Sequence, residues 1–447
     1  MKIRKYAALA ATALAASLAL TACGGNGATT DVGTGDAGAV VADGDCGAAP
    51  STLTISFWSP IEPSIIQSFT DEYGINVQIN NSPEAAVAYE AIRNGLATGG
   101  AGLSDLHYME ADSIPELMAV PGDWATLPTV AGRWLDWKDA QATIDGNLKG
   151  YGTDIGPLAI AFDSEALAEA GLPSDPAAFA EFLGGDNATW QSYFDAGRQY
   201  RAATGRAWLN NVGDALNAAV QQLPDPYENP ATGMPYDLSC NEPIHAIFTQ
   251  FGQAIEDGLS AGISTWGPDA APGFQQSSFA TVIAPAWMTG HISNSVGDRT
   301  GWRIAEVFPE GGGNWGGSFI AMPATGDNVC WATVLANWLT SPENAVTQFL
   351  YQGHFPSQIA ALENPEVTDT ENPFFGNQQV GGIYAAMAAK TPVAATTGFR
   401  GERFPGIMAL VGEGLGRVQD GIETTAQAWD STVAEFEALG LPVEGCN

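Results

Sequence analysis

Strand and helix patterns alternate most clearly in residues 53–109, which read LTISFWSPIEPSIIQSFTDEYGINVQINNSPEAAVAYEAIRNGLATGGAGLSDLHYM. The apolar runs 53–58 and 106–109 and the alternating stretch 75–79 predict three strands. Residues 63–73 and 85–98 have helical spacing, and each of these stretches is followed by glycine, which commonly ends a helix. The order strand, helix, strand, helix, strand predicts an α/β fold whose mostly parallel sheet is covered by helices on both faces.

The same kind of signal continues along the chain. Asp175-Pro176 and Ser341-Pro342 precede the helical stretches 177–183 and 344–351. An Asp or Ser cap followed by proline in the first turn is typical of a helix N-terminus. The glycine-rich residues 311–317 predict a loop before an apolar segment at 319–323.

Composition and charge exclude several classes of protein. The chain has 447 residues, and its 50 Asp and Glu against 16 Lys and Arg give a formal net charge of −34. So acidic a surface repels phosphate backbones, so we expect no nucleic-acid partner. Because 45% of the residues are hydrophobic, the chain can bury a large core and is not globally disordered. Its length exceeds one ordinary core and suggests two or three domains.

The first residues have the pattern of an export signal. Residues 1–22 combine Lys and Arg with an apolar stretch, and they end in LTA immediately before Cys23. This resembles a bacterial lipoprotein signal, which implies cleavage before Cys23 and lipidation of its thiol. Residues 23–49 contain no aromatic residue, Lys or Arg and are rich in glycine, which predicts a flexible, lipid-anchored tether.

If Cys23 carries lipid, an even number of cysteines remains for disulfides in an oxidising compartment. These are Cys46, Cys240, Cys330 and Cys446, and they allow three pairings. No two of them have the C-x-x-C spacing that is typical of a metal site, so we expect these cysteines to hold no metal ion.

A series of short segments extends over residues 53–440: FWS at 57–59, DLHYME at 105–110, GYGTDIGP at 150–157, AFDSE at 161–165, AGLP at 170–173, ATW at 188–190, AWMTG at 286–290, SPEN at 341–344, GHFPS at 353–357 and AW at 428–429. In this order they resemble the segments of the family 1 sugar-binding cluster, the extracellular solute-binding lipoproteins of carbohydrate ABC importers. No single segment is specific, but the segments occur in the same order as in the family and extend over nearly the whole body of the chain.

The resemblance implies a two-lobed periplasmic-binding-protein-like fold with discontinuous domains joined by crossing hinge strands. We expect residues 50–148 and 317–356 in lobe 1, and residues 149–316 and 357–447 in lobe 2. On that layout a bridge between lobes would oppose the hinge. The resemblance therefore favours the disulfides Cys46–Cys330 and Cys240–Cys446, each within one lobe.

The resemblance also suggests which residues hold a ligand. Flat aromatic rings suit the C–H face of a sugar, and carboxylates or amides suit its hydroxyls. At the matched segments these residues are Trp58, Trp287 and Trp315 as platforms, Glu62, Glu110, Asp112, Asp154 and Gln378 as hydrogen-bond partners, and Gly316 as a point of close backbone approach. Trp58, Glu110 and Asp112 also follow predicted strands, whose carboxyl ends share one rim.

We therefore expect a non-enzymatic protein that captures a mono- or oligosaccharide, most plausibly a neutral oligosaccharide, for ABC permease subunits. We expect a monomer held at the extracellular face of the cell membrane by its lipid alone, with no cofactor and no metal. Catalysis has little support, because the histidines lack metal spacing and there is no Walker loop or nucleophile elbow. Two alternatives stay open: a binding protein for polyamine or peptide, and a lipid-anchored glycoside hydrolase with paired carboxylates.

Overall fold

The structure is a computed structural model, and it describes residues 46–119 and 122–445. The predicted signal peptide, Cys23, most of the predicted tether and Cys446 lie outside the described residues. Lipidation of Cys23 and the bridge between Cys240 and Cys446 therefore stay predictions. Among the helices that are described, none combines the length and the apolar character needed to cross a membrane.

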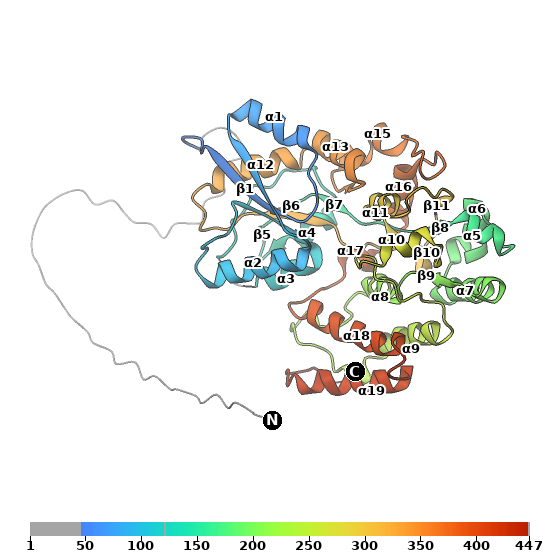
Figure 1. Ribbon diagram of the computed structural model, residues 1–447. Coiled ribbons are helices and arrows are strands. Elements are labelled where there is room, and N and C mark those ends of the chain that lie inside the picture. Colours follow the sequence, from blue (N-terminus) through green and yellow to red (C-terminus); the bar gives the residue numbers. More distant parts are fainter. Residues whose placement is uncertain (1–45, 120–121, 446–447) are drawn as a thin grey trace, which may run out of the picture. The chain divides into compact units, whose positions relative to one another are not determined.

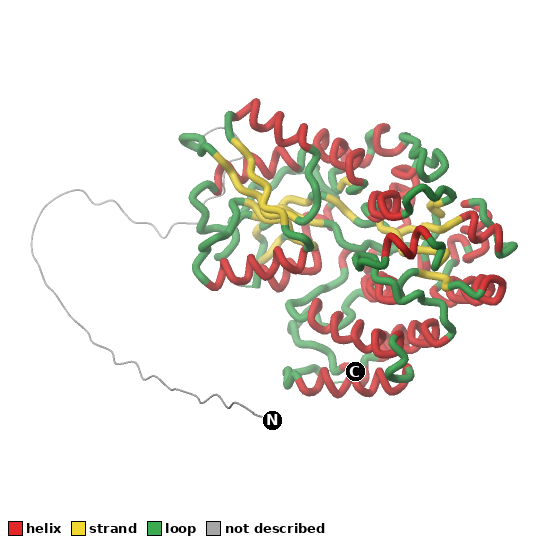
Figure 2. Tube along the Cα trace, viewed as in Figure 1, coloured by secondary structure: helices red, strands yellow, loops and turns green. Residues whose placement is uncertain are grey.

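The first sheet has the strand order β2-β1-β3-β12-β6. Figure 1 labels its strands β1 and β6, and Figure 2 draws the strands in yellow. Its strands are β1 (Thr52–Phe57), β2 (Asn76–Asn81), β3 (Leu106–Glu110), β6 (Tyr151–Gly152) and β12 (Ser318–Ala321). The three strands predicted within residues 53–109 are confirmed, and β1 runs parallel to both β2 and β3. The expected parallel arrangement holds for these three strands, whereas β12 returns from a distant part of the chain and lies antiparallel to β3 and β6, so the sheet as a whole is mixed.

The second sheet has the strand order β11-β8-β10-β9. Its strands are β8 (Leu158–Asp163), β9 (Ala207–Leu209), β10 (Phe279–Pro285) and β11 (Trp302–Ala305). β10 runs parallel to β9 and antiparallel to β8, so this sheet is mixed as well. Two short antiparallel pairs complete the strands: β7 (Asp154–Ile155) with β13 (Phe355–Pro356), and β4 (Thr143–Ile144) with β5 (Asn147–Leu148).

The helices near the first sheet are α1 (Pro63–Tyr73), α2 (Ala85–Ala97), α3 (Ile114–Leu117), α4 (Asp136–Gln141) and α12 (Val329–Leu339). Helix α1 has the predicted bounds. Pro63 supplies a suitable first turn, and Gly74 adopts the left-handed φ of 69° that ends the helix. Helix α2 also matches its prediction to within one residue.

The remaining helices belong mainly to the part of the chain around the second sheet. They are α5 (Ser164–Glu169), α6 (Pro176–Leu183), α7 (Trp190–Thr204), α8 (Val212–Gln221), α9 (Glu242–Glu256), α10 (Ala270–Gln275), α11 (Met288–Ser295), α13 (Pro342–Gln352), α14 (Ile359–Leu362), α15 (Pro365–Thr368), α16 (Val380–Lys390), α17 (Val393–Thr397), α18 (Phe404–Gln419) and α19 (Thr425–Ala438). Helices α9, α18 and α19 pack against one another (Figure 1).

Buried apolar side chains form two separate clusters. The first core is built from residues between 53 and 151 and between 319 and 339, and it surrounds the first sheet. The second core is built from residues between 155 and 308 and between 345 and 436, and it surrounds the second sheet. The chain therefore passes between the cores after β6, before β12 and again between α12 and α13. The lobe boundaries given above stay predictions.

A disulfide joins Cys46 to Cys330, with 5.4 Å between their Cα atoms. It connects the residues that precede β1 to helix α12, and both ends belong to the part of the chain around the first core. This confirms one of the two predicted bridges.

Candidate ligand-binding site

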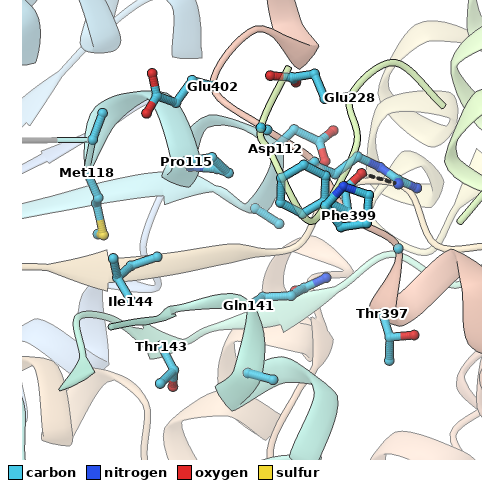
Figure 3. A pocket seen from close by; sticks show the side chains of 18 of the residues that line it. Asp112, Pro115, Met118, Gln141, Thr143, Ile144, Glu228, Thr397, Phe399 and Glu402 are labelled. Atoms are coloured by element: carbon cyan, nitrogen blue, oxygen red, sulfur yellow. Dashed lines mark hydrogen bonds between the residues drawn. The ribbon is translucent and has the colours of Figure 1, made fainter. Parts of the chain in front are cut away.

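A cavity of about 930 Å³ lies where residues of the two cores approach each other (Figure 3). One side comes from the chain after β3 and from α4 to β5. The other side comes from the end of α8, from the loop before β12 and from the segment between α17 and α18. Its lining residues lie in the ranges 111–119, 122–124, 137–149, 221–233, 314–316 and 395–403.

The charges around this cavity are nearly balanced. The acidic residues that line it are Asp112, Asp145, Glu228 and Glu402, and the basic ones are Lys149, Arg400 and Arg403. The whole chain, by contrast, contains 50 Asp and Glu residues and only 16 Lys and Arg residues. The cavity is therefore much less anionic than the protein as a whole. Its lining also includes the aromatic side chains of Trp124, Trp137 and Phe399.

Asp112, Gln221 and Arg400 form one hydrogen-bonded chain at the cavity. Nε2 of Gln221 donates to Oδ2 of Asp112 at 2.5 Å, and Oε1 of Gln221 accepts from Nε of Arg400 at 3.0 Å. Arg400 also donates to the backbone carbonyls of Gln221 and Leu223. Burial raises the pKa of Asp112, although the charges of Arg400 and Lys138 and the bond from Gln221 oppose that effect. The side-chain amide of Gln221 thus links two half-buried opposite charges.

Two further ionisable groups lie close to these three side chains: Glu110, which is half-buried, and Lys138, which is fully buried. Burial, together with the charges of Asp112 and Asp154, raises the pKa of Glu110 to about 7. Burial lowers the pKa of Lys138 to about 7, against the attraction of Asp154 and Asp112. Nζ of Lys138 lies 3.7 Å from the centre of the Phe319 ring and has no hydrogen-bond partner among the described residues. Both groups can therefore change charge near neutral pH.

Asp154 lies on β7, in the passage between the cores, and is 6% exposed. Its Oδ1 accepts from the backbone N–H of Ser318 at 2.8 Å and from the hydroxyl of Thr153 at 2.7 Å. Gly317, the residue before Ser318, has a φ of 90°, and a Cβ there would lie 2.7 Å from the backbone oxygen of Asp154. Glycine is required at this position for both reasons. Asp154 thus holds the start of β12 in place.

Trp58 and Glu110 are brought together through Tyr89. The Trp58 ring meets the Tyr89 ring edge-on at 5.6 Å between centroids, and it also contacts Tyr108. The hydroxyl of Tyr89 accepts from the backbone N–H of Glu110 at 2.8 Å. The half-buried indole of Trp58 therefore lies at the carboxyl end of β1, next to the end of β3, where parallel strands place ligand-contacting residues.

Trp287, Trp315 and Gly316 form a second aromatic group. The rings of Trp287 and Trp315 lie 5.5 Å apart at 78°, and Nε1 of Trp287 donates to the backbone oxygen of Trp315 at 3.3 Å. A Cβ on Gly156 would lie 1.8 Å from that same oxygen, so only glycine allows this approach. Gly316 lines the cavity, and a Cβ there would lie 3.7 Å from Nε1 of Trp287. Gly316 therefore lies between the cavity and the Trp287 indole, although neither indole of the pair is itself a lining residue.

Glu62 and Gln378 lie away from the cavity and are engaged by backbone groups. The carboxylate of Glu62 accepts from the backbone N–H of Ser64 and caps α1. The amide of Gln378 exchanges two hydrogen bonds with the backbone of Ile304, on the edge strand β11. Among the predicted ligand residues, Asp112 and Gly316 line the cavity. The other predicted residues are not among its lining residues: Trp58, Glu62, Glu110, Asp154, Trp287, Trp315 and Gln378. All of the predicted ligand contacts stay predictions.

Sequence reasoning missed Gln221, Arg400 and the exposed Trp266. Gln221 ends an ordinary amphipathic helix, and no local signal marks it. Arg400 stands in the run FRGER at 399–403, which also contains Arg403. Two arginines so close together are unusual in so acidic a chain, and this was the available signal. Trp266 stands in the turn-rich run STWGPD at 264–269. Over residues 46–119 and 122–445, no group of His, Cys, Asp and Glu is arranged to hold a metal ion.

A family of bacterial extracellular solute-binding proteins matches residues 64–375, which is well over half of the chain. The chain belongs to this family. The family consists of transport receptors associated with ABC transporters, so this solute-binding protein is not an enzyme.

Solved structures agree with that assignment. This solute-binding protein is 32% identical to a protein described as extracellular solute-binding protein family 1, with a TM-score of 0.77 over 87% of this chain and 99% of that one. A binding protein from B. animalis subsp. lactis Bl-04, in complex with β-1,6-galactobiose, is 19% identical and has a TM-score of 0.71 over 89% and 100% of the two chains. The galacto-N-biose/lacto-N-biose I-binding protein of Bifidobacterium longum is 16% identical, with a TM-score of 0.68 over 88% and 98%.

These likenesses confirm the two-lobed periplasmic-binding-protein-like α/β fold that the sequence predicts. The last two likenesses, below 25% identity, bear on the fold alone. A comparison with curated proteins finds no match.

Proposed function

We propose that this solute-binding protein captures a neutral oligosaccharide and delivers it to the permease of an ABC transporter. One observation carries the proposal: the cavity of about 930 Å³ has nearly balanced charges, and its lining includes the aromatic side chains of Trp124, Trp137 and Phe399. Gly316, which follows Trp315 in the chain, lines it as well. The volume falls within the usual range of ligand pockets, about 300–1,000 Å³.

The chemistry of the lining suits a carbohydrate. A sugar ring has a face of polarised C–H bonds, and the negative face of an aromatic ring attracts it. Its hydroxyls both donate and accept, so they can pair with the carboxylate of Asp112, the amide of Asn314 and the amide of Gln141, which all line the cavity. Two of the similar structures were solved with a bound disaccharide, β-1,6-galactobiose in one and lacto-N-biose in the other. Those ligands support the class proposed here and do not identify the sugar.

The cavity's charges disfavour a cationic ligand. A polyamine site needs a clear excess of carboxylates, whereas Lys149, Arg400 and Arg403 offset all but one of the acids in this lining. A strongly anionic ligand would be repelled by the four acidic side chains of the lining. An uncharged, hydroxyl-rich ligand avoids both penalties, because neither it nor the protein has to leave a charge unpaired on binding.

The partners follow from this role. The proposal includes transmembrane permease subunits that receive the sugar, a lipid anchor at Cys23 and a monomeric binding protein at the extracellular face of the membrane. Energy for uptake would come from a partner ATPase, since the sequence contains no Walker loop.

Isothermal titration calorimetry tests the proposal. The protein, produced without residues 1–22, is titrated with maltooligosaccharides, β-1,6-galactooligosaccharides, lacto-N-biose and spermidine at low and at high sodium chloride. We expect saturable binding of at least one saccharide, with an affinity that salt changes little, because screening acts on charges. Saturable binding of spermidine that weakens steeply with salt, with no response to any saccharide, would overturn the proposal in favour of a polyamine receptor.

A further inference from the structure

Trp266 has an exposed indole that the fold itself does not need. Among the described residues it is the tryptophan whose side chain is exposed, at 62%. It lies in the loop between α9 and α10, which contacts the end of β9. An exposed indole presents a flat face whose negative charge density suits the C–H face of a sugar ring.

The backbone under Trp266 is firmly held. The neighbouring hydroxyl of Thr265 accepts from Nδ2 of Asn210 at 2.8 Å and donates to Oδ2 of Asp214 at 2.5 Å. Thr265 and Asn210 are 3% and 2% exposed, so this hydrogen-bonded group is buried. Buried polar groups that are bonded in this way fix a local conformation. The loop is therefore anchored one residue before the exposed ring.

The ring itself is also held. Trp266 stacks on Trp287 with 5.8 Å between centroids and 24° between planes, and it contacts the ring of His291 at 4.8 Å. One face of the indole is thus supported and the rest is open to solvent. A rigid aromatic ring binds a ligand with little loss of conformational entropy, which makes such a ring an efficient contact.

Trp266 continues a row of indoles that begins at the cavity. Gly316 lines the cavity, Trp315 precedes it, Trp287 packs against Trp315, and Trp266 packs against Trp287. These residues come from three loops that the second core brings together. The row therefore connects Gly316, a cavity-lining residue, to the exposed ring of Trp266, so a ligand that fills the cavity and extends past Gly316 can contact that ring.

We infer that Trp266 is an outer stacking platform for an oligosaccharide chain whose end projects beyond the cavity, and that it sets a preference for longer chains. This inference rests on the proposed function, and it names the part of the ligand that Trp266 contacts. The indole face would pack against the C–H face of a terminal ring. A disaccharide held at the cavity would not reach it.

The test compares wild type with Trp266→Ala and Trp266→Phe by calorimetry. The probes are maltooligosaccharides and β-1,6-galactooligosaccharides, each from disaccharide to hexasaccharide. Ile422→Ala is the matched control, because Ile422 is similarly exposed, at 68%, in the turn after α18. Thermal unfolding of each variant checks that the fold is kept.

In wild type we expect affinity to rise with chain length in the series that binds. Trp266→Ala should remove that increment, a loss of about two- to tenfold for the longer chains, and leave the disaccharide unchanged. Trp266→Phe should keep part of the increment, and Ile422→Ala should behave as wild type. In the wild-type protein, a long chain should also protect Trp266 from acrylamide quenching, as judged against Trp266→Phe.

Three results would overturn the inference. Equal affinities of wild type and Trp266→Ala at every length would show that the ring makes no contact. A higher affinity of Trp266→Ala than of wild type for saccharides of every chain length would show that the Trp266 ring covers Trp287 and blocks it. A wild type that binds disaccharides with no gain for longer chains would rule out an outer platform while leaving the proposed function intact. If wild type binds no saccharide of any kind, the proposed function itself fails.

Discussion

The side chains of Asp112 and Gln221 join the two halves of the molecule through a 2.5 Å hydrogen bond. Asp112 follows β3 of the first sheet, and Gln221 ends α8, which packs in the second core. Because Gln221 also accepts from Arg400, one amide links groups that approach the cavity from both sides. In a family whose lobes close around ligands, such a bond favours the closed arrangement.

Replacing Gln221 by alanine should therefore loosen the closed form and lower stability. Its loss removes the hydrogen bond that Nε of Arg400 makes in a half-buried position, which costs about 0.5–1.5 kcal/mol in the free energy of unfolding. Urea unfolding measures that loss. Small-angle scattering of the ligand-free protein should show a larger radius of gyration than for wild type. Gln67→Ala is the control, because the amide of Gln67 bonds Asp71 on the exposed face of α1 and contributes no more than about 0.5 kcal/mol. Identical unfolding and scattering for Gln221→Ala and wild type would contradict the role of this bond.

Trp287→Ala should weaken saccharide binding far more than it weakens the fold. The indole is half-buried, borders Gly316 at the cavity and supports both Trp315 and Trp266. Anchoring aromatic residues in binding sites commonly contribute about 2 kcal/mol or more, which corresponds to about a thirtyfold change in Kd. Calorimetry with the best saccharide of the panel measures the effect.

Trp338→Phe is the matched control for that substitution. Nε1 of Trp338 donates to the backbone oxygen of Ile65 in the first core, away from the cavity. It should lower the melting temperature and leave Kd unchanged. If Trp287→Ala bound the sugar as tightly as wild type, the indole row could not be the binding surface.

Local pattern predicted the elements around the first sheet well. The apolar run at β1 and the helical spacing of α1 depend on residues close in sequence, so they are readable without the structure. The mixed sheet was not predictable in that way. Strand β12 pairs with β3 across about two hundred residues of chain, and its direction depends on where the chain returns from the second core.

The residues of the candidate site also differ in how far sequence alone can predict them. Glu110 and Asp112 were predicted as neighbours because they directly follow a buried strand. Gln221, Arg400 and Trp266 were missed, because their importance arises from partners that are far away in sequence, such as the contact between Gln221 and Asp112. Glu62 has the residue type of a ligand group, yet it caps a helix, and sequence alone does not distinguish these roles.

The raised pKa of Glu110 predicts how the free energy of unfolding depends on pH. Burial and the charges of Asp112 and Asp154 raise its pKa from 4.5 to about 7. Between these values the folded chain keeps a proton that the unfolded chain releases, so stability falls as pH rises. The stabilisation is complete below pH 4.5 and is lost by about pH 7, at a rate of at most about 1.4 kcal/mol per pH unit.

Glu110→Gln removes this titration. Relative to wild type, the variant should therefore become more stable as pH rises from 4.5 to 7.5, by up to about 3 kcal/mol. Urea unfolding at several pH values measures the difference. Glu90→Gln is the control, since it makes the same chemical change at an exposed position on the neighbouring helix α2. A difference between Glu110→Gln and wild type that does not vary with pH would mean that Glu110 titrates as an exposed carboxyl does.

Gly156 and Gly317 should both resist replacement by alanine, because each allows a backbone approach at the passage between the cores. A Cβ on Gly156 would lie 1.8 Å from the backbone oxygen of Trp315, which forces the Trp315 loop away. A Cβ on Gly317 would lie 2.7 Å from the backbone oxygen of Asp154, at a φ of 90° that alanine rarely adopts. Each substitution should lower the free energy of unfolding by about 1–3 kcal/mol through overpacking, and Gly156→Ala should also weaken sugar binding by displacing Trp315.

Gly416→Ala provides a control with the opposite sign. Gly416 lies within helix α18, and a Cβ there meets nothing within 4 Å. Alanine in a helix interior is better than glycine by about 0.5–1 kcal/mol, so this variant should be more stable than wild type and bind sugar equally well. Chemical unfolding and calorimetry on the three variants give a direct comparison. If Gly156→Ala kept full stability and affinity, the close contact between Gly156 and Trp315 would not be needed to position the indole, and the geometry assigned to the aromatic row would have to be revised.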